Sequence, residues 1–177
     1  MTVLADAAAE SAARVWQAAW MDGHRGHVPD ELLAVRDAPH FAAYLRRHRA
    51  DTTVCVDQDG DILGLVISDL ATGEVVQLAV EAGSRGTGTA DLLLEAAEAR
   101  LAERHRQAWL AVVPGNGRAR AFYARHGWRD AAAQLYQAPA ASGEIAVPVR
   151  RYVKDLVRDH RTARSPIRDG TKDGATH

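Results

Sequence analysis

A glycine-rich segment at residues 85–90 has the clearest chemical potential in the sequence. It reads Arg85-Gly86-Thr87-Gly88-Thr89-Ala90 and lies between an apolar run and a long helical pattern. The first turn of a helix has unpaired N–H groups and a partial positive charge, so it attracts phosphate. Gly86 and Gly88 would let the backbone approach an anion closely, and Arg85 would add a charged donor. The segment therefore predicts a phosphate-binding loop.

Two other phosphate motifs do not fit this loop. A P-loop requires a Gly-Lys pair, which the chain lacks. A dinucleotide-binding turn requires a third glycine at the position where Asp91 stands. A strand-to-helix connection that uses glycine only to turn remains the alternative interpretation.

Hydrophobic periodicity indicates the elements that would position the loop. We expect helices at residues 6–21, after Asp30, around 41–45, directly after the loop, and at 118–126. We expect strands at residues 52–56, 62–67, 74–80, 109–113, 128–136 and 145–156, with a small-residue segment at 138–143. This alternation of helices and strands predicts an α/β domain with a mixed sheet.

Length and composition limit the class of protein. The 177 residues fit one domain with a tail, expected as a domain at 1–157 and a disordered basic tail at 158–177. A formal net charge of −1 argues against a broad basic surface for nucleic acid. No apolar run is long enough to span a membrane, and no secretory signal is recognised. Cys55 alone cannot form an internal disulfide. We expect a cytoplasmic globular protein.

Two blocks in register resemble the GNAT superfamily of N-acetyltransferases. Residues 85–90 are similar to its Gln/Arg-x-x-Gly-x-Gly/Ala signature. The second block, with Asn116, Ala119, Phe122-Tyr123 and Gly127-Trp128, is similar to its Asn-x-x-Ala-x-x-Phe-Tyr-x-x-x-Gly-Phe/Trp segment. Ala82 departs from the proline that many members have there. The resemblance implies an α/β fold with a mixed, mostly antiparallel central sheet and a splayed strand pair, flanked by helices.

The resemblance implies that acetyl-CoA is the acyl donor. Its pyrophosphate would bind the N–H groups of the loop, namely Arg85, Gly86, Thr87, Gly88, Thr89 and Ala90. Pantetheine would pair with the backbone of Leu78, Ala79 and Val80 like an added strand, and an N–H near Val80 would polarise the thioester. Asn116 would face the same groove, and it would also be a good helix N-cap without any ligand.

Tyr123 is the candidate general acid. It follows Asn116 by seven residues, about two helical turns, so both side chains can face one groove. A phenol with a reference pKa near 10 can protonate a departing thiolate whose thiol pKa is about 8.5. The alternative role for Tyr123 is a core aromatic beside Phe122.

Glu74 is the candidate general base. Alternation along the strand would place Glu74, Val76, Leu78 and Val80 on one face. The resemblance implies that an acid at this position takes the proton from the amine, often through water. The alternative is a solvated carboxylate at the strand end. Glu81 is a weaker candidate because alternation sends it to the opposite face.

The acceptor pocket has no recognisable signature. Trp20, His24, His27 and Tyr136 are its candidate residues. His24 and His27 lie beside two glycines that indicate a loop, and no further ligand completes a metal site, so we expect no metal.

The predicted function is acetyl transfer from acetyl-CoA to a primary amine, by direct attack in a ternary complex. The acceptor is a small amine or aminoglycoside-like compound, or a peptide or protein amine. The alternative is a non-catalytic acyl-CoA-binding or regulatory module. We expect no nucleic-acid or membrane partner, and a homodimer is left open.

Overall fold

A seven-stranded sheet forms the centre of the computed structural model, which describes residues 1–140 and 143–157. Its order is β1-β2-β3-β4-β5-β7-β6, and each neighbouring pair except β4 and β5 is antiparallel. The strands are β1 (Thr2–Val3), β2 (Thr52–Val56), β3 (Ile62–Asp69), β4 (Glu74–Val80), β5 (Gln107–Val112), β6 (Arg129–Ala140) and β7 (Gly143–Asp155). The predicted mixed, mostly antiparallel sheet is confirmed.

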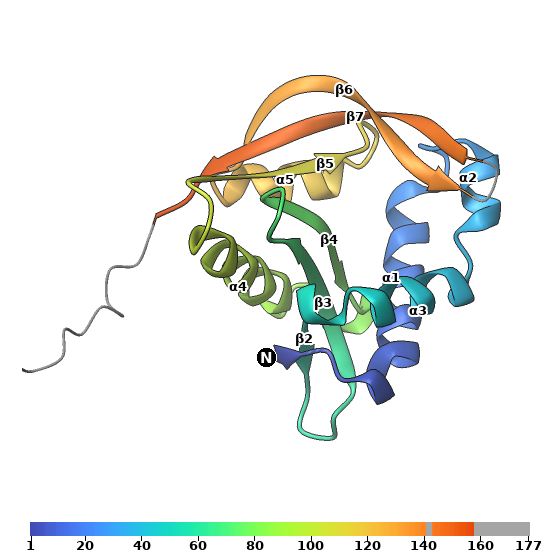
Figure 1. The fold of residues 1–177 in the computed structure, drawn as a ribbon, viewed down its shortest axis with the longest axis vertical. Coiled ribbons are helices and arrows are strands. Elements are labelled where there is room, and N and C mark those ends of the chain that lie inside the picture. Colours follow the sequence, from blue (N-terminus) through green and yellow to red (C-terminus); the bar gives the residue numbers. More distant parts are fainter. Residues whose placement is uncertain (141–142, 158–177) are drawn as a thin grey trace, which may run out of the picture.

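Helices cover both faces of this sheet (Figure 1). They are α1 (Ala9–His24), α2 (Asp30–Val35), α3 (Ala38–Arg47), α4 (Thr89–Ala102) and α5 (Gly117–Arg125), with short 3-10 turns at Asp6–Ala8, Arg49–Asp51 and Ala82–Ser84. One core lies under α1 and α3 and includes Trp16, Phe41 and Leu65. A second core lies under α4 and α5 and includes Leu94 and Leu110. Each face of the sheet is therefore buried by its own pair of helices.

β4 and β5 pair at one end only and then run apart (Figure 1). The single paired position joins Glu74 and Trp109, and the Trp109 N–H donates to the Gly73 carbonyl at 3.0 Å. Beyond it, β5 continues antiparallel to β7. The predicted splayed strand pair is thus present, and it opens a gap in the middle of the sheet.

Two segments differ from those expected. α1 continues to His24, which lies in its last turn and not in a loop. β6 continues through Pro139 to Ala140 and pairs with the start of β7, where a separate small-residue segment was expected. Pro139 is tolerated because β6 is an edge strand, where a missing N–H need not break a ladder. Residues 141–142, and the predicted tail at 158–177, lie outside the described residues.

The even-numbered residues of β4 do not share one face, so this expectation was wrong. Val76 packs against the core under α1 and α3. Leu78 and Val80 pack against the core under α4. The cause is an irregularity in the β3–β4 pairing between Ile67 and Ser68, which reverses the alternation of side chains along β4.

Candidate functional site

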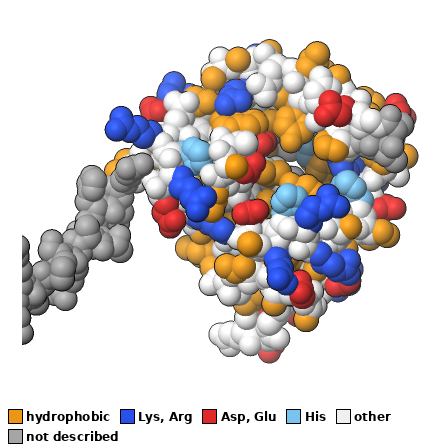
Figure 2. All heavy atoms as spheres, viewed as in Figure 1, with side chains coloured by type: hydrophobic (Ala, Val, Ile, Leu, Met, Phe, Trp, Pro, Cys, Tyr) orange, Lys and Arg blue, Asp and Glu red, His pale blue; other side chains and the backbone are white. Residues whose placement is uncertain are grey.

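A cavity of about 740 Å³ is lined by residues on both sides of the gap between β4 and β5. At one end its walls are the loop before α4 and the start of α5, and at the other they are α1, α3, β6 and β7. Figure 2 shows a hollow with hydrophobic side chains inside and with Lys, Arg and His side chains at its margin. The cavity therefore extends across the gap, with the loop before α4 at one end and aromatic side chains of α1 and α3 at the other.

The predicted phosphate loop ends at the first turn of α4. Gly86 and Gly88 have φ values of 78° and 88°, a backbone conformation that glycine adopts readily. Gly88 is the N-cap of α4, and no side chain caps the helix there. The first N–H groups of a 14-residue helix are thus presented beside the cavity, which Gly86 and Gly88 both line.

Thr87 and Thr89 stabilise this loop from within. The Thr87 hydroxyl donates to the Ser84 carbonyl at 2.7 Å and lies 2.9 Å from the Thr89 hydroxyl. Thr89 is buried. Neither threonine lines the cavity, whereas Arg85 and Ala90 do. Both hydroxyls therefore form hydrogen bonds inside the loop. Only the backbone N–H groups of these two residues are left to bind a ligand.

Asp22 and Arg118 are site residues that the sequence did not reveal. The Asp22 carboxylate, on α1, lies 2.9 Å from Arg85 and 2.7 Å from Arg118 on α5. The hydrogen bond from Arg118, followed by the charges of both arginines, lowers the Asp22 pKa below its usual value. Both arginines line the cavity. One carboxylate thus holds two cations from different elements beside the phosphate loop, a pairing that only the tertiary fold creates.

The backbone of β4 presents N–H groups to the gap. The Glu81 N–H donates to the Leu63 carbonyl on β3 at 2.8 Å. N–H directions alternate along a strand, so the Ala79 N–H group also points toward β3. The N–H groups of Leu78 and Val80 point away from β3. On that side, β5 has already diverged from β4. The strand edge is thus open to a ligand at Leu78 and Val80.

Asn116 and Tyr123 both line the cavity from the α5 side. The Asn116 carbonyl oxygen accepts a hydrogen bond from the Ala119 N–H at 3.0 Å, so Asn116 is the N-cap of α5. Tyr123 is 8% exposed, and its ring packs against Trp128 with centroids 6.0 Å apart. Burial raises the pKa of the Tyr123 phenol above its usual value. This phenol is therefore fully protonated at neutral pH.

Glu74 lies at the end of β4 that still pairs with β5, and it lines the cavity. Its side chain is buried, and its pKa is raised to about 7, first by burial and then by the charge of Asp69, against the opposing effect of Arg151. The same carboxylate acts electrostatically on the hydroxyls of Tyr44 and Tyr136. A carboxyl group with this pKa can accept and release a proton near neutral pH.

Glu81 has a structural role. Its carboxylate accepts a hydrogen bond from the Ser84 N–H at 3.0 Å and caps the short turn Ala82–Ser84. It does not line the cavity that contains Glu74 and Tyr123. The geometry therefore favours Glu74 over Glu81 as the base.

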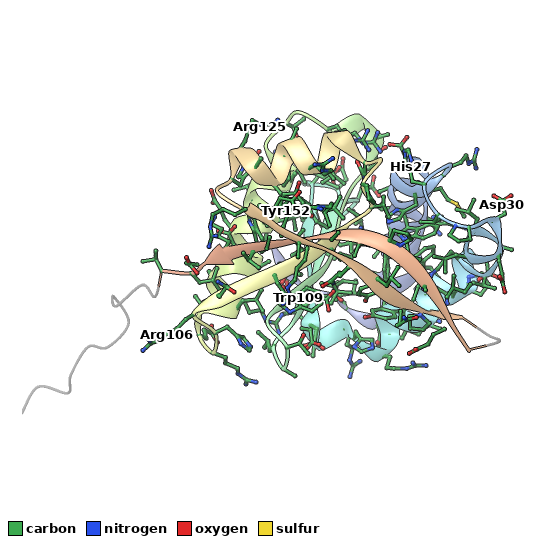
Figure 3. All side chains as sticks on the ribbon, turned by 90° about the horizontal axis from the view of Figure 1, so that it is seen from above. His27, Asp30, Arg106, Trp109, Arg125 and Tyr152 are labelled. Atoms are coloured by element: carbon green, nitrogen blue, oxygen red, sulfur yellow. The ribbon has the colours of Figure 1, made fainter. Side chains whose placement is uncertain are left out.

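Three of the four candidate acceptor residues line the cavity: Trp20, His24 and Tyr136. Trp20 and His24 stack, with ring centroids 4.4 Å apart, and burial lowers the His24 pKa. His27 does not line it; this side chain is exposed, beyond the end of α1 and next to Gly115 (Figure 3). Within residues 1–140 and 143–157, no group of three or more His, Cys, Asp or Glu residues is arranged to hold a metal ion.

The family comparison identifies the class of protein. The model described as the acetyltransferase (GNAT) family matches residues 10–128, a span that contains both motifs, α4, α5 and all but the first residue of α1. The chain belongs to the GNAT acetyltransferase family. A search of proteins with curated function found no match.

Solved GNAT structures share this fold. A GCN5-related N-acetyltransferase from Rhodopseudomonas palustris is 17% identical, with a TM-score of 0.66 over 86% of this chain and 92% of that one. A phosphinothricin acetyltransferase from Sinorhizobium meliloti, in complex with acetyl-CoA, is 14% identical, with a TM-score of 0.63 over 86% and 85%. The PaiA N-acetyltransferase from Thermoplasma acidophilum, in complex with coenzyme A, is 14% identical, with a TM-score of 0.61 over 87% and 96%.

The predicted enzyme class is confirmed by this family membership and fold. The chain is an N-acetyltransferase of the GNAT family. In the part of the chain that the structure describes, no helix is long and apolar enough to cross a membrane.

Proposed function

We propose that this GNAT protein transfers acetyl from acetyl-CoA directly to a primary amine, with Glu74 as general base and Tyr123 as general acid. The observation that carries the proposal is that one cavity is lined by both residues, with an open strand edge between them. Their protonation states suit the two roles. Glu74 has a pKa of about 7, and burial keeps the Tyr123 phenol protonated.

The donor would lie along the α4–α5 side of the cavity. Its pyrophosphate would accept hydrogen bonds from the N–H groups of the loop at 85–90, supported by the charges of Arg85 and Arg118. Pantetheine would pair with the open edge of β4 at Leu78 and Val80. Asn116 would retain its cap and face the same groove.

The acetyl transfer then follows from these positions. Glu74 accepts a proton from the ammonium group, directly or through water, and the free amine attacks the thioester carbonyl carbon. The Val80 N–H donates to the oxygen that gains negative charge. When the C–S bond breaks, the Tyr123 hydroxyl donates its proton to the departing thiolate. The nitrogen, which is positively charged after the attack, loses its second proton to water, and the Tyr123 phenolate takes a proton back from water. The products are the acetylated amine and CoA.

Measurement of CoA release tests this function. A panel of primary amines is incubated with enzyme and acetyl-CoA, and free thiol is recorded with and without each amine. We expect amine-dependent release, and no acetylated protein by mass spectrometry when the amine is omitted. Tight acetyl-CoA binding without turnover of any amine would instead favour the non-catalytic acyl-CoA-binding or regulatory module.

Cytoplasmic location and the absence of nucleic-acid and membrane partners stay predictions, and a homodimer stays open. The division into a domain at 1–157 and a tail at 158–177 also stays a prediction. Deletion of residues 158–177 should leave acetyl transfer unchanged if the tail has no role in the reaction.

The loop glycines give a direct test of donor binding. Gly86→Ala and Gly88→Ala should each lower the free energy of unfolding by about 1 kcal/mol, because both positions have positive φ. Each should also raise KM for acetyl-CoA by about 10-fold, since the new methyl group stands beside the anion site. Thermal melts and steady-state kinetics measure the two effects.

Gly60 is the matched control for these variants. It has φ 89° in the β2–β3 turn, and an added Cβ there would meet nothing within 4 Å. Gly60→Ala should reduce stability similarly while leaving KM for acetyl-CoA unchanged. If all three variants gave the same KM, the loop would have only a turning role.

A further inference from the structure

A half-buried arginine lies at the acceptor end of the cavity. Arg36 directly follows α2 and lines the cavity. Burial is the main cause that lowers its pKa. Over residues 1–140 and 143–157, no carboxylate lies within 4.0 Å of its guanidinium group, and its side-chain hydrogen bond goes to the Nε2 atom of His40. Burial lowers the His40 pKa, so this partner is a neutral acceptor at neutral pH.

Arg36 and Glu74 act on the same two phenols. The charge of Glu74 raises the pKa values of Tyr44 and Tyr136, and the charge of Arg36 lowers them. Yet Arg36 and Glu74 do not form an ion pair with each other within the described part of the chain. The cavity therefore holds a cation and a carboxyl group apart, with two tyrosines near both.

Aromatic, aliphatic and basic side chains line most of the rest of this end. Trp16 packs on Phe41 and Tyr44, with ring centroids 4.7 and 5.3 Å apart. Arg47, on α3, also lines this end, and Glu74 is the one acidic residue that the described α1, α3, β4, β6 and β7 contribute to the lining. A polycation would thus meet two arginines and one carboxyl group, an unfavourable charge balance.

We propose that the acceptor is a small amine that also carries a carboxylate or similar oxyanion, with its ammonium group at Glu74 and its oxyanion at Arg36. This inference rests on the proposed function and narrows its acceptor class. Arginine suits the role because its planar fork can hold a carboxylate with two hydrogen bonds. The aromatic walls would contact the apolar part of the acceptor, and aminoglycoside-like polycations would be poor substrates.

Matched acceptor pairs test the inference. L-phenylalanine is compared with L-phenylalaninamide, and 6-aminohexanoate with 6-aminohexanamide, so that the pairs differ in charge and cover two spacings. We expect kcat/KM to be about 10- to 100-fold higher for the carboxylate member of at least one pair. Spermidine serves as the polycation and should be the weakest substrate. A preference for both amides or for spermidine would overturn the inference.

Substitution of Arg36 assigns the preference to this side chain. Arg36→Met should bring the ratio within the preferred pair close to one while leaving kcat/KM for the amide within about 2-fold. Arg36→Lys keeps the charge and should retain part of the preference for the carboxylate member. Such partial retention would show that the loss in Arg36→Met does not come from misfolding. Arg106→Met is the matched control, because Arg106 is exposed at the far end of the molecule (Figure 3) and does not line the cavity.

Binding separates this inference from the proposed function. Trp16 and Trp20 line the cavity, so their fluorescence can report acceptor binding without turnover. If no amine is acetylated but the carboxylate members bind more tightly than the amides and lose that advantage in Arg36→Met, the proposed function fails, while the assignment of Arg36 as the site that binds the oxyanion stands. If amines are acetylated with equal kcat/KM within both pairs, or if Arg36→Met weakens both members equally, the inference fails and the function stands.

Discussion

Replacement of Tyr123 by Phe is expected to lower kcat by about 100-fold or more, with little change in KM for acetyl-CoA. The substitution removes one hydroxyl from a ring that is 8% exposed and packed against Trp128, so the ring contacts remain. Only the proton donor to the departing thiolate is lost. Steady-state kinetics with a saturating acceptor measure the effect, and thermal melts check that the fold is kept.

Tyr152 is the matched control for this experiment. Its ring centroid lies 6.4 Å from that of Tyr123, but Tyr152 does not line the cavity, and its hydroxyl accepts a hydrogen bond from Arg120. Tyr152→Phe should therefore mainly lower the free energy of unfolding, with a smaller effect on kcat. Equal losses of kcat in both variants would mean that Tyr123 acts through packing and not as an acid.

The raised pKa of Tyr123 also has a kinetic consequence. Because burial raises it above the usual value of 10.0, the phenol stays protonated through neutral and mildly alkaline pH. The acid form is thus available wherever Glu74 has lost its proton. The two groups can be in their active forms together over a wide range above pH 7, which a base and an acid with similar pKa values could not achieve.

The parts of the site that depend on local chemistry could be predicted from the sequence. Gly88 precedes a helical pattern and adopts a positive φ, which glycine does readily. Asn116 precedes the next helix and is its N-cap. These features depend on neighbours within a few residues, and so did the predicted strand that contains Leu78 and Val80.

The remaining features depend on contacts between distant segments. The irregular pairing between Ile67 and Ser68 determines which β4 side chains face which core, and no pattern within β4 reveals it. Asp22 meets Arg118 only because α1 and α5 approach the same loop. Arg36 reaches the cavity because α2 contacts β6. The acceptor pocket in particular is built from such contacts, which explains why sequence alone left its substrate open.

The second large effect is expected at Glu74. Glu74→Gln should lower kcat/KM at pH 8 by about 100-fold or more, because the amide cannot accept the ammonium proton. In the wild type, the carboxylate is the active form, so kcat/KM should rise with pH through about 7. The rise attributable to Glu74 should be absent in Glu74→Gln. An unchanged pH profile in the variant would assign the rise to the acceptor amine instead.

Two neighbouring charges should move this pH profile in opposite directions. Asp69 raises the pKa of Glu74, so Asp69→Asn should shift the rise to lower pH. Arg151 lowers it, so Arg151→Gln should shift the rise to higher pH. Neither residue lines the cavity. Shifts of opposite sign from two substitutions outside the cavity would be difficult to explain if any group other than Glu74 were the base.

The same carboxyl group should make the active enzyme less stable than its inactive variant. Because folding raises the pKa of Glu74 from 4.5 to about 7, the folded state holds the proton more tightly than the unfolded state does. The wild type should therefore lose stability as pH rises from 4.5 through 7, by about 3 kcal/mol at most. Glu74→Gln carries no such penalty and should be the more stable protein at pH 8, with the difference shrinking toward pH 4.5. Urea unfolding at the two pH values measures this, and a difference independent of pH would show that Glu74 does not titrate in this range.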